Sequence, residues 1–393
     1  MTGFRHVAVI DVGKTNAKLA LVDVEKMEEI AVERRPNRVL YSTPWPHFDL
    51  DGLWDFFSSG LTHLHRAHGI DAISVTTHGA SGVLLDASGR VAAPMLDYEH
   101  TGPDGLRRNY DRARPPFSET GAPRLGGGLN LGAQFYWQFV TDPGLKDRTT
   151  HVVTYPQYWG FRLTGQIACD VCSLGCHTDL WNPWSGKFST LVERLGLSAK
   201  MAPPMRPDET LGPVTPGIAN RLCLTRGTLV SVGIHDSNAS LLPYLTSRTS
   251  PFAVVSTGTW VIAMAIGGAK VTLKPERDTL VNVNAFGHPV PSARFMGGRE
   301  YEEIVKGSTA IPSAADRSGV HPAATFNQPV VLEKFWDQEW DAAVVFCRQA
   351  DRPGEDHQRR AARTLGARWH ELDTGHYPML SMPDALTRII LEG

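Results

Sequence analysis

The sequence predicts an α/β protein with two or three domains. Its 393 residues are enough to build two or three hydrophobic cores. Hydrophobic residues make up 42% of the chain and charged residues 20%, a balance typical of globular rather than disordered proteins. Two strand–turn–strand units, at residues 7–23 and 252–266, enclose segments with both helical and strand patterns. Helices and strands are therefore expected to alternate along the chain.

The first of these units joins two apolar strands through a polar turn. Residues 7–10 form an apolar run, and residues 19–22 resume a β pattern. The turn between them supplies Asp11, Gly13, Lys14, Thr15 and Asn16. Backbone N–H groups, side-chain donors and a carboxylate in one turn suit a polyphosphate with its Mg²⁺. We interpret the turn as a phosphate site, with an ordinary hairpin carrying a polar turn as the alternative.

A P-loop is a second interpretation of the same glycine. Gly13, Lys14 and Thr15 reproduce the last three residues of that motif. However, its first glycine should stand where the chain has Ala8, and a helix should follow where the chain continues as a strand. The sequence therefore argues against a P-loop.

Composition also limits which partners and which cellular compartment are expected. A formal net charge of −2 and the lack of a basic block give no attraction to nucleic acid. No apolar run approaches the roughly 20 residues that a bilayer crossing needs, and the N-terminus lacks a signal-peptide pattern. Five cysteines, an odd number, fit a reducing compartment. We expect a cytoplasmic protein without a membrane partner; a homodimer is left open.

Three of the cysteines form a C-x2-C-x3-C pattern. Cys169, Cys172 and Cys176, with His177 adjacent, could indicate a metal or cluster site. No fourth ligand is spaced to complete it, and cysteine is also common as a small buried residue. Burial is the favoured interpretation.

The remaining elements are expected in the following order. A helix over residues 52–68, with Asp51 as its N-cap, precedes a strand over 72–76, a turn over 78–82 and a strand over 83–86. A loop over residues 94–100 follows; it gathers Asp97, Glu99 and His100 and could bind sugar hydroxyls or lie solvated. Helices over 131–140 and 155–163, a short helix over 191–195, a strand over 229–232 and strands over 252–255 and 261–266 complete the series.

An aspartate between two phosphate-type hairpins resembles the fold of actin, hexokinase and heat-shock-70 ATPases, a ribonuclease H-like fold. Within it the motifs resemble the FGGY family of carbohydrate kinases over about residues 7–310. The matching segments are Asp11 to Lys18, Thr77-His78-Gly79, Leu163-Thr164-Gly165 with Asp170 and Ser173, Gly233-x-x-Asp236-x-x-Ala239, and Ser256 to Thr259. Residues 97–100 and 295–300 are similar to the fuculose and rhamnulose kinases of the family.

The resemblance implies ATP-dependent phosphorylation of a sugar hydroxyl, on a ketose or deoxyketose such as L-fuculose or L-rhamnulose. Asp236 would be the general base, and Asp11 would hold Mg²⁺. Phosphate contacts are implied for Gly13, Lys14, Thr15, Asn16, Lys18, Gly258 and Thr259; sugar contacts are implied for His78, Gly79, Glu99 and Asp236. An N-cap is the alternative role of Asp236. A catalytically impaired remnant that binds sugar or nucleotide is the alternative function.

The resemblance divides the chain into three parts. Residues 1–245 correspond to the N-terminal kinase domain and residues 246–315 to a partial second domain. Residues 316–393 are similar to the last strand, helix and histidine loop of an α/β-hydrolase of the esterase type. His376 would be its catalytic histidine, but a G-x-S-x-G nucleophile elbow is lacking, so we expect no esterase activity. The alternative is that this tail completes the second kinase domain in a divergent form.

Overall fold

The computed structural model describes residues 4–257, 261–269, 271–295, 343–348 and 355–373, together with 382, 385, 388 and 389. The chain divides into two compact units, Met1–Gly297 and Gly298–Gly393. None of the helices in the described ranges combines the length and apolar character needed to cross a membrane.

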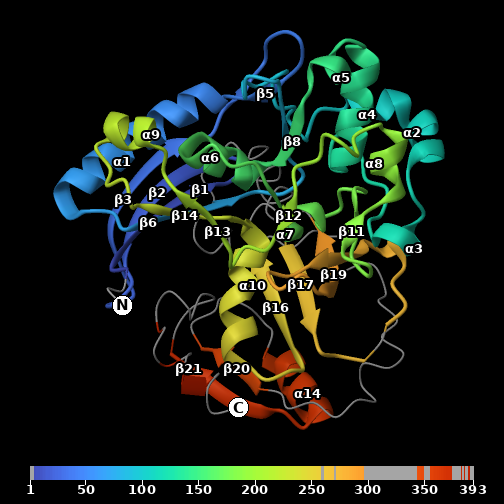
Figure 1. Cartoon of the computed structure of the whole chain (residues 1–393). Coiled ribbons are helices and arrows are strands. Elements are labelled where there is room, and N and C mark those ends of the chain that lie inside the picture. Colours follow the sequence, from blue (N-terminus) through green and yellow to red (C-terminus); the bar gives the residue numbers. More distant parts are fainter. Residues whose placement is uncertain are drawn as a thin grey trace, which may run out of the picture. The chain divides into compact units, whose positions relative to one another are not determined.

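A seven-stranded sheet forms the centre of the first unit, in the order β13-β14-β6-β1-β2-β3, with β15 also paired to β6 (Figure 1). β1, β2 and β3 are antiparallel neighbours, whereas β6 runs parallel to β1, β14 and β15. The strands are β1 (His6–Val12), β2 (Asn16–Asp23), β3 (Glu28–Pro36), β6 (Ala72–Thr77), β13 (Thr210–Pro213), β14 (Leu229–Ser231) and β15 (Ile234–His235). The carboxyl ends of β1, β6 and β15 therefore lie side by side.

Buried and half-buried residues alternate along β1, so its fully buried side chains lie on one face of this sheet. Ala8, Ile10 and Val12 are fully buried in β1, whereas the residues between them are only half-buried. Two helices, α1 (Leu50–His68) and α6 (Tyr155–Thr164), share this core with β1, and Phe57 meets Trp159 edge to face at 5.3 Å. The expected helix over residues 52–68 is confirmed.

The N-cap of α1 differs from the expectation. Asp49, not Asp51, accepts a hydrogen bond from the Gly52 N–H, and its carboxylate also pairs with Arg35 at 2.6 Å. Asp51 lies inside the first turn and is exposed. Sequence favoured the nearer aspartate, but the helix begins two residues earlier and so brings Asp49 within reach of the free N–H groups.

A helical region follows β6, with a second core of its own. It includes a strand pair, β7 (Gly82–Leu85) and β8 (His151–Thr154), and a buried helix, α4 (Leu131–Thr141). The other elements up to residue 205 are β4 (Val39–Leu40), β5 (His47–Phe48), η1 (Gly102–Leu106), α2 (Arg107–Ala113), α3 (Phe117–Thr120), α5 (Leu145–Arg148), β9 (Cys169–Asp170), α7 (Val171–Leu174), β10 (Trp181–Asn182), β11 (Lys187–Phe188), α8 (Thr190–Arg194) and β12 (Pro204–Met205).

A second sheet, antiparallel and four-stranded, follows in the order β16-β17-β19-β18 (Figure 1). It contacts the inserted region, because the Val281 N–H donates to the Gly121 carbonyl at 2.9 Å and Val283 lies against Gly175. Its elements and those before it are α9 (Pro216–Leu222), α10 (Asp236–Ser247), β16 (Phe252–Thr257), β17 (Val261–Ile266), η2 (Pro275–Arg277), β18 (Thr279–Val283) and β19 (Pro289–Phe295). The strands of both expected strand–turn–strand units are confirmed, and residues 258–260 between β16 and β17 lie outside the described residues.

The second unit contains a parallel strand pair. β20 (Ala343–Cys347) pairs with β21 (Arg368–Leu372), and α14 (Glu355–Leu365) connects them. His376 and the loop around it lie outside the described residues. The expected domain boundaries after residues 245 and 315 stay predictions.

Candidate functional site

A cavity of about 590 Å³ opens in the first unit, between the central sheet and the second sheet. The central sheet contributes the β1–β2 turn and the residues that follow β6 and β15. The second sheet contributes Ser256, Ile262, Leu280, Asn282 and Arg294. Segments more than 200 residues apart in the chain therefore share one site.

The β1–β2 turn is fixed from outside by one asparagine. Gly13 N–H donates to the Asn16 carbonyl at 2.9 Å and closes the turn. Asn37 donates twice, from its N–H to the Thr15 carbonyl at 2.9 Å and from Nδ2 to the Gly13 carbonyl at 2.8 Å. Thr15 and Asn16 stay exposed and line the cavity. The turn is thus rigid while its polar groups remain available to a ligand.

Asp11 and Asp236 bring two carboxylates into this cavity. Burial and the negative charge of Asp236 raise the pKa of Asp11. Asp236 is the first residue of α10, and its carboxylate accepts a hydrogen bond from the Ser237 N–H at 2.6 Å. The N-cap is His235, so the alternative role of Asp236 as the cap does not hold.

His235 lies between Asp236 and a cysteine. Its Nε2 is 3.1 Å from Oδ1 of Asp236 and 3.7 Å from Sγ of Cys176. Burial opposes protonation of this imidazole, but Cys176 and Asp236 outweigh it and raise the pKa of His235 well above its usual range. Burial likewise opposes ionisation of Asp236, but the hydrogen bond and the charge of His235 lower its pKa. The contact with His235 therefore favours the ionised form of Asp236.

His78 presents a neutral acceptor to the same cavity. It is 6% exposed and packs among the rings of Phe48, Tyr98 and Tyr155, at centroid distances of 5.0 to 5.3 Å. Burial lowers the pKa of His78 to about 4. Nδ1 lies 2.9 Å from the Gly79 carbonyl, which can only accept, so Nδ1 carries the proton. Nε2 is then an acceptor, and it is buried without a hydrogen-bond partner among the described residues.

Lys14 lies in the phosphate turn, but its ammonium group points to the expected sugar loop. It contacts Oδ1 of Asp97 and lies 3.6 Å from Oε2 of Glu99. The rings of Phe48 and Tyr98 lie 4.8 and 4.7 Å from Nζ. Asp97 also accepts from the Glu99 N–H at 3.2 Å. Lys14 therefore joins the turn to the loop that carries Glu99.

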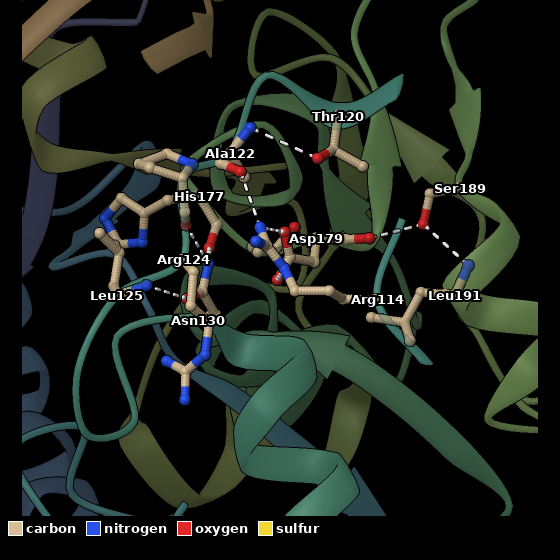
Figure 2. Close-up of polar contacts among 12 residues, drawn as sticks. Arg114, Thr120, Ala122, Arg124, Leu125, Asn130, His177, Asp179, Ser189 and Leu191 are labelled. Carbon is tan, nitrogen blue, oxygen red and sulfur yellow. Dashed lines mark hydrogen bonds and ion pairs between the residues drawn. The ribbon is translucent and has the colours of Figure 1, made fainter. Parts of the chain in front are cut away.

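Cys176 reaches the cavity from a strained turn. His177 and Asp179 have positive φ values of 43° and 63°, although neither is glycine. Figure 2 shows what holds this turn: Arg114 donates to the Asp179 carboxylate at 2.8 Å, and Asn130 donates to the His177 carbonyl at 2.9 Å. The Asp179 side chain is fully buried and also accepts from the Tyr110 hydroxyl at 2.7 Å.

The structure brings most of the predicted site residues together. The cavity is lined by Asp11, Gly13, Lys14, Thr15, Asn16, Lys18, His78, Gly79 and Asp236. Lys18 is also paired with Glu29 at 2.6 Å. Glu99 is not part of the lining and reaches the site through Lys14. Gly258 and Thr259 lie outside the described residues.

Several lining residues were not foreseen. His235 and Cys176 lie next to predicted motifs, so the signal for them was their position beside Asp236 and after Ser173. Asn282 and Arg294 come from β18 and β19, where no motif marks them. Both are buried, and Asn282 donates to the Ser292 hydroxyl at 3.1 Å.

The metal interpretation of the cysteine pattern gains no support. Within the described ranges, no group of three or more His, Cys, Asp or Glu side chains is arranged to hold a metal ion. Cys169 and Cys172 are buried, whereas Cys176 lines the cavity. Asp11 offers a carboxylate at the start of the phosphate turn, which suits a Mg²⁺ ion that takes its other ligands from phosphates and water.

Comparison with known proteins identifies the family. The profile described as the FGGY family of carbohydrate kinases, N-terminal domain, matches residues 6–243. The profile described as carbohydrate kinase FGGY, C-terminal domain, matches residues 249–362. The second match includes part of the tail in which the sequence resembled a hydrolase.

Individual relatives agree with these matches. An L-fuculokinase of Salmonella typhi is 23% identical over 270 residues, covering 67% of this chain and 57% of the relative. A rhamnulokinase of Pectobacterium atrosepticum is 24% identical, covering 65% and 52%. The chain thus spans about half the length of these curated relatives.

Solved structures show the same fold. A carbohydrate kinase from Novosphingobium aromaticivorans is 39% identical, with a TM-score of 0.70, covering 76% of this chain and 66% of that one. A ligand-bound xylulose kinase from Lactobacillus acidophilus is 15% identical, with a TM-score of 0.69, covering 82% and 67%. The expected actin-like ATPase fold is confirmed, and the chain belongs to the FGGY family of carbohydrate kinases.

Proposed function

We propose that the protein transfers the γ-phosphoryl group of ATP to a hydroxyl of a ketose or deoxyketose, such as L-fuculose or L-rhamnulose. The observation that supports this most is that Asp236, 3.1 Å from Nε2 of His235, shares one cavity with Asp11 and the turn at residues 13–16. Named relatives that are fuculokinases and rhamnulokinases support the substrate class.

Asp236 is proposed as the general base. Phosphoryl transfer passes through a loose transition state, so the nucleophile must be oriented more than it must be strongly activated. A carboxylate kept ionised by His235 is ready to accept the hydroxyl proton at neutral pH. General-base catalysis of this kind contributes about 10² to 10⁴ in rate.

The phosphate groups are proposed to contact Gly13, Lys14, Thr15, Asn16 and Lys18, with Gly258 and Thr259 from the second hairpin. Lys14 would contribute through the main chain of the turn, because its ammonium group is paired with Asp97. Ser256 lines the cavity at the start of the second hairpin and supports a phosphate contact there. Asp11 is the proposed Mg²⁺ ligand, and the ion would neutralise charge on the phosphate oxygens.

The sugar is proposed to lie against His78, Gly79 and Asp236, with Glu99 oriented by Lys14. The acceptor Nε2 of His78 would receive one sugar hydroxyl, which supplies the partner that this buried atom otherwise lacks in the described structure. Gly79 lets the main chain lie close to the His235 ring that contacts Asp236, because a Cβ there would lie 2.8 Å from Nε2 of His235.

Calorimetry with a non-hydrolysable ATP analogue and Mg²⁺, followed by a panel of deoxyketoses and by a coupled assay of ADP release, tests this proposal. We expect saturable binding of one sugar and phosphorylation that Asp236→Asn lowers at least about 10²-fold. Asp51→Asn, at an exposed position in the first turn of α1, is the matched control and should retain activity. Near-normal turnover by Asp236→Asn would remove that residue from the mechanism, and a folded protein that binds no sugar on the panel would overturn the proposed substrate class.

A further inference from the structure

Cys176 lies in the wall of the cavity beside the histidine that holds Asp236. Its Sγ is 3.7 Å from Nε2 of His235, and the residue is only 5% exposed. What remains accessible faces the cavity, because Cys176 belongs to its lining. The sulfur is therefore reachable only by molecules small enough to enter that space.

The chemistry of this cysteine differs from that of its neighbours in sequence. Burial opposes ionisation, but the charges of His177 and His235 outweigh it and lower the pKa of Cys176. Burial raises the pKa of Cys169 to about 12 and raises that of Cys172 well above its usual range. The thiolate is the nucleophilic form, so the lowered pKa favours reaction at Cys176 and the raised pKa values disfavour it at Cys169 and Cys172.

The backbone that follows Cys176 adopts energetically unfavourable conformations. Left-handed conformations at His177 and Asp179 each disfavour the folded state by about 1 to 3 kcal/mol. A buried ion pair between Arg114 and Asp179 fixes them (Figure 2). Strain that is held in place in this way is typical of functional sites. This turn places Cys176 in the cavity wall next to Gly79, because a Cβ added at Gly79 would lie 3.1 Å from the sulfur.

A second feature marks this wall as a ligand site. His78 is 6% exposed, lines the same cavity, and has no hydrogen-bond partner for Nε2 among the described residues. A buried acceptor of this kind needs a donor from a ligand or from water. A ligand that reaches His78 therefore occupies the space that Cys176 also borders.

We propose that Cys176 is a modification site at which hydrogen peroxide and small alkylating electrophiles react, and that its modification blocks sugar binding. The second half of this statement rests on the proposed function of the cavity. The thiolate attacks one peroxide oxygen; an S–O bond forms, the O–O bond breaks, and the leaving hydroxide takes a proton from the His235 imidazolium to become water. Sulfur is oxidised to a sulfenic acid and peroxide is reduced.

Modification would change the site in two ways. The added oxygen or alkyl group enters the narrow space beneath Gly79, where the backbone already lies close to the sulfur. The thiolate charge that helps to keep His235 protonated is also lost, so the charge partner of Asp236 is weakened. Both changes act on the place where the sugar hydroxyl must meet Asp236.

Labelling of the folded full-length chain tests the site. Iodoacetamide at pH 7 forms an S–C bond and releases iodide, and mass spectrometry gives the rate at each cysteine. We expect Cys176 to react at least about ten-fold faster than Cys169 and Cys172, and peroxide followed by dimedone to tag Cys176. The exposed Cys223 is the internal reference, and Cys223→Ser should leave labelling of Cys176 unchanged. Labelling of Cys223 with Cys176 unmodified would overturn the modification site.

Calorimetry tests the second half of the proposal, that modification of Cys176 blocks sugar binding; we call this effect the switch. Calorimetry before and after peroxide treatment should show at least about a ten-fold loss of sugar affinity in the wild type, and none in Cys176→Ser measured against its own untreated sample. An unchanged affinity after complete modification would overturn the switch. If the untreated protein binds no sugar on the panel while Cys176 is still labelled selectively, the modification site stands and the proposed function fails together with the switch.

Discussion

The ammonium group of Lys14 contacts the carboxylate of Asp97 across 83 residues of sequence, and both side chains are less than 10% exposed. Asp97 in turn accepts the Glu99 N–H, so the phosphate turn and the proposed sugar loop share one ion pair. A change in either segment is therefore transmitted to the other through these groups.

Lys14→Met tests this connection. The substitution keeps an unbranched side chain between Phe48 and Tyr98 but leaves the Asp97 carboxylate unpaired. Removing one partner of a buried ion pair costs about 3 to 5 kcal/mol. We expect the free energy of unfolding in urea to fall by about 3 kcal/mol. Arg148→Met, which breaks the exposed pair with Asp142, is the control and should cost less than about 1 kcal/mol. Equal losses in the two variants would show that the buried contact does not persist in solution.

His78→Phe should separate sugar recognition from nucleotide binding. The phenyl ring retains the packing against Phe48, Tyr98 and Tyr155 but removes the Nε2 acceptor. A sugar hydroxyl left without its acceptor costs about 1 to 3 kcal/mol, so the sugar KM should rise about 5- to 150-fold. Affinity for the ATP analogue should stay the same, as measured by calorimetry without sugar. A variant with an unchanged sugar KM would exclude His78 as a sugar ligand.

The opening hairpin and the position of Asp236 could be predicted because both depend on local signals. An apolar run, a polar turn and a second apolar run fix β1 and β2, and a strand before Gly233 places Asp236 at the start of a helix. The expected fold followed from two such hairpins in one chain. These features need no knowledge of which segments meet.

The remaining parts of the site depend on contacts between distant segments. Cys176 and His235 are 59 residues apart, and no spacing rule joins them. The turn that carries Cys176 has positive φ at His177 and Asp179, where sequence would have favoured glycine. Strand alternation in β18 and β19 gives two faces, but does not tell which of them meets the cavity, so Arg294 could not be assigned.

Gly79→Ala should lower activity without unfolding the protein. A Cβ at this position would lie 2.8 Å from Nε2 of His235 and 3.1 Å from Sγ of Cys176, so the pair that orients Asp236 must shift. We expect kcat in the coupled assay to fall about 10²-fold, with a small change in thermal midpoint. Gly105→Ala is the matched control, since a Cβ there meets no atom within 4 Å. Full activity in Gly79→Ala would show that catalysis does not depend on the positions of His235 and Cys176.

The Cys176 and His235 pair predicts an unusual dependence of stability on pH. The folded pKa of Cys176 is lowered and that of His235 is raised, from unfolded values near 9.0 and 6.5. Between pH 6.5 and 9 the unfolded pair holds one proton, on sulfur. The lowered pKa of Cys176 and the raised pKa of His235 favour one proton in the folded pair as well, on the imidazole. The proton counts are equal, so the pair contributes no slope in this window.

Cys176→Ala should make the free energy of unfolding depend on pH, because the cysteine no longer balances the proton that His235 binds. In the folded variant Asp236 still raises the pKa of His235, although the thiolate no longer contributes, whereas the unfolded chain holds no such proton above pH 6.5. Since the unfolded state then binds fewer protons, stability falls as pH rises, by up to about 1.4 kcal/mol per pH unit. Urea unfolding at several pH values should therefore show the difference between wild type and Cys176→Ala widening from pH 6.5 towards 9. The double variant Cys176→Ala with His235→Gln should lose this slope. A difference that stays constant across the window would show that Asp236 alone does not keep His235 protonated in the folded variant.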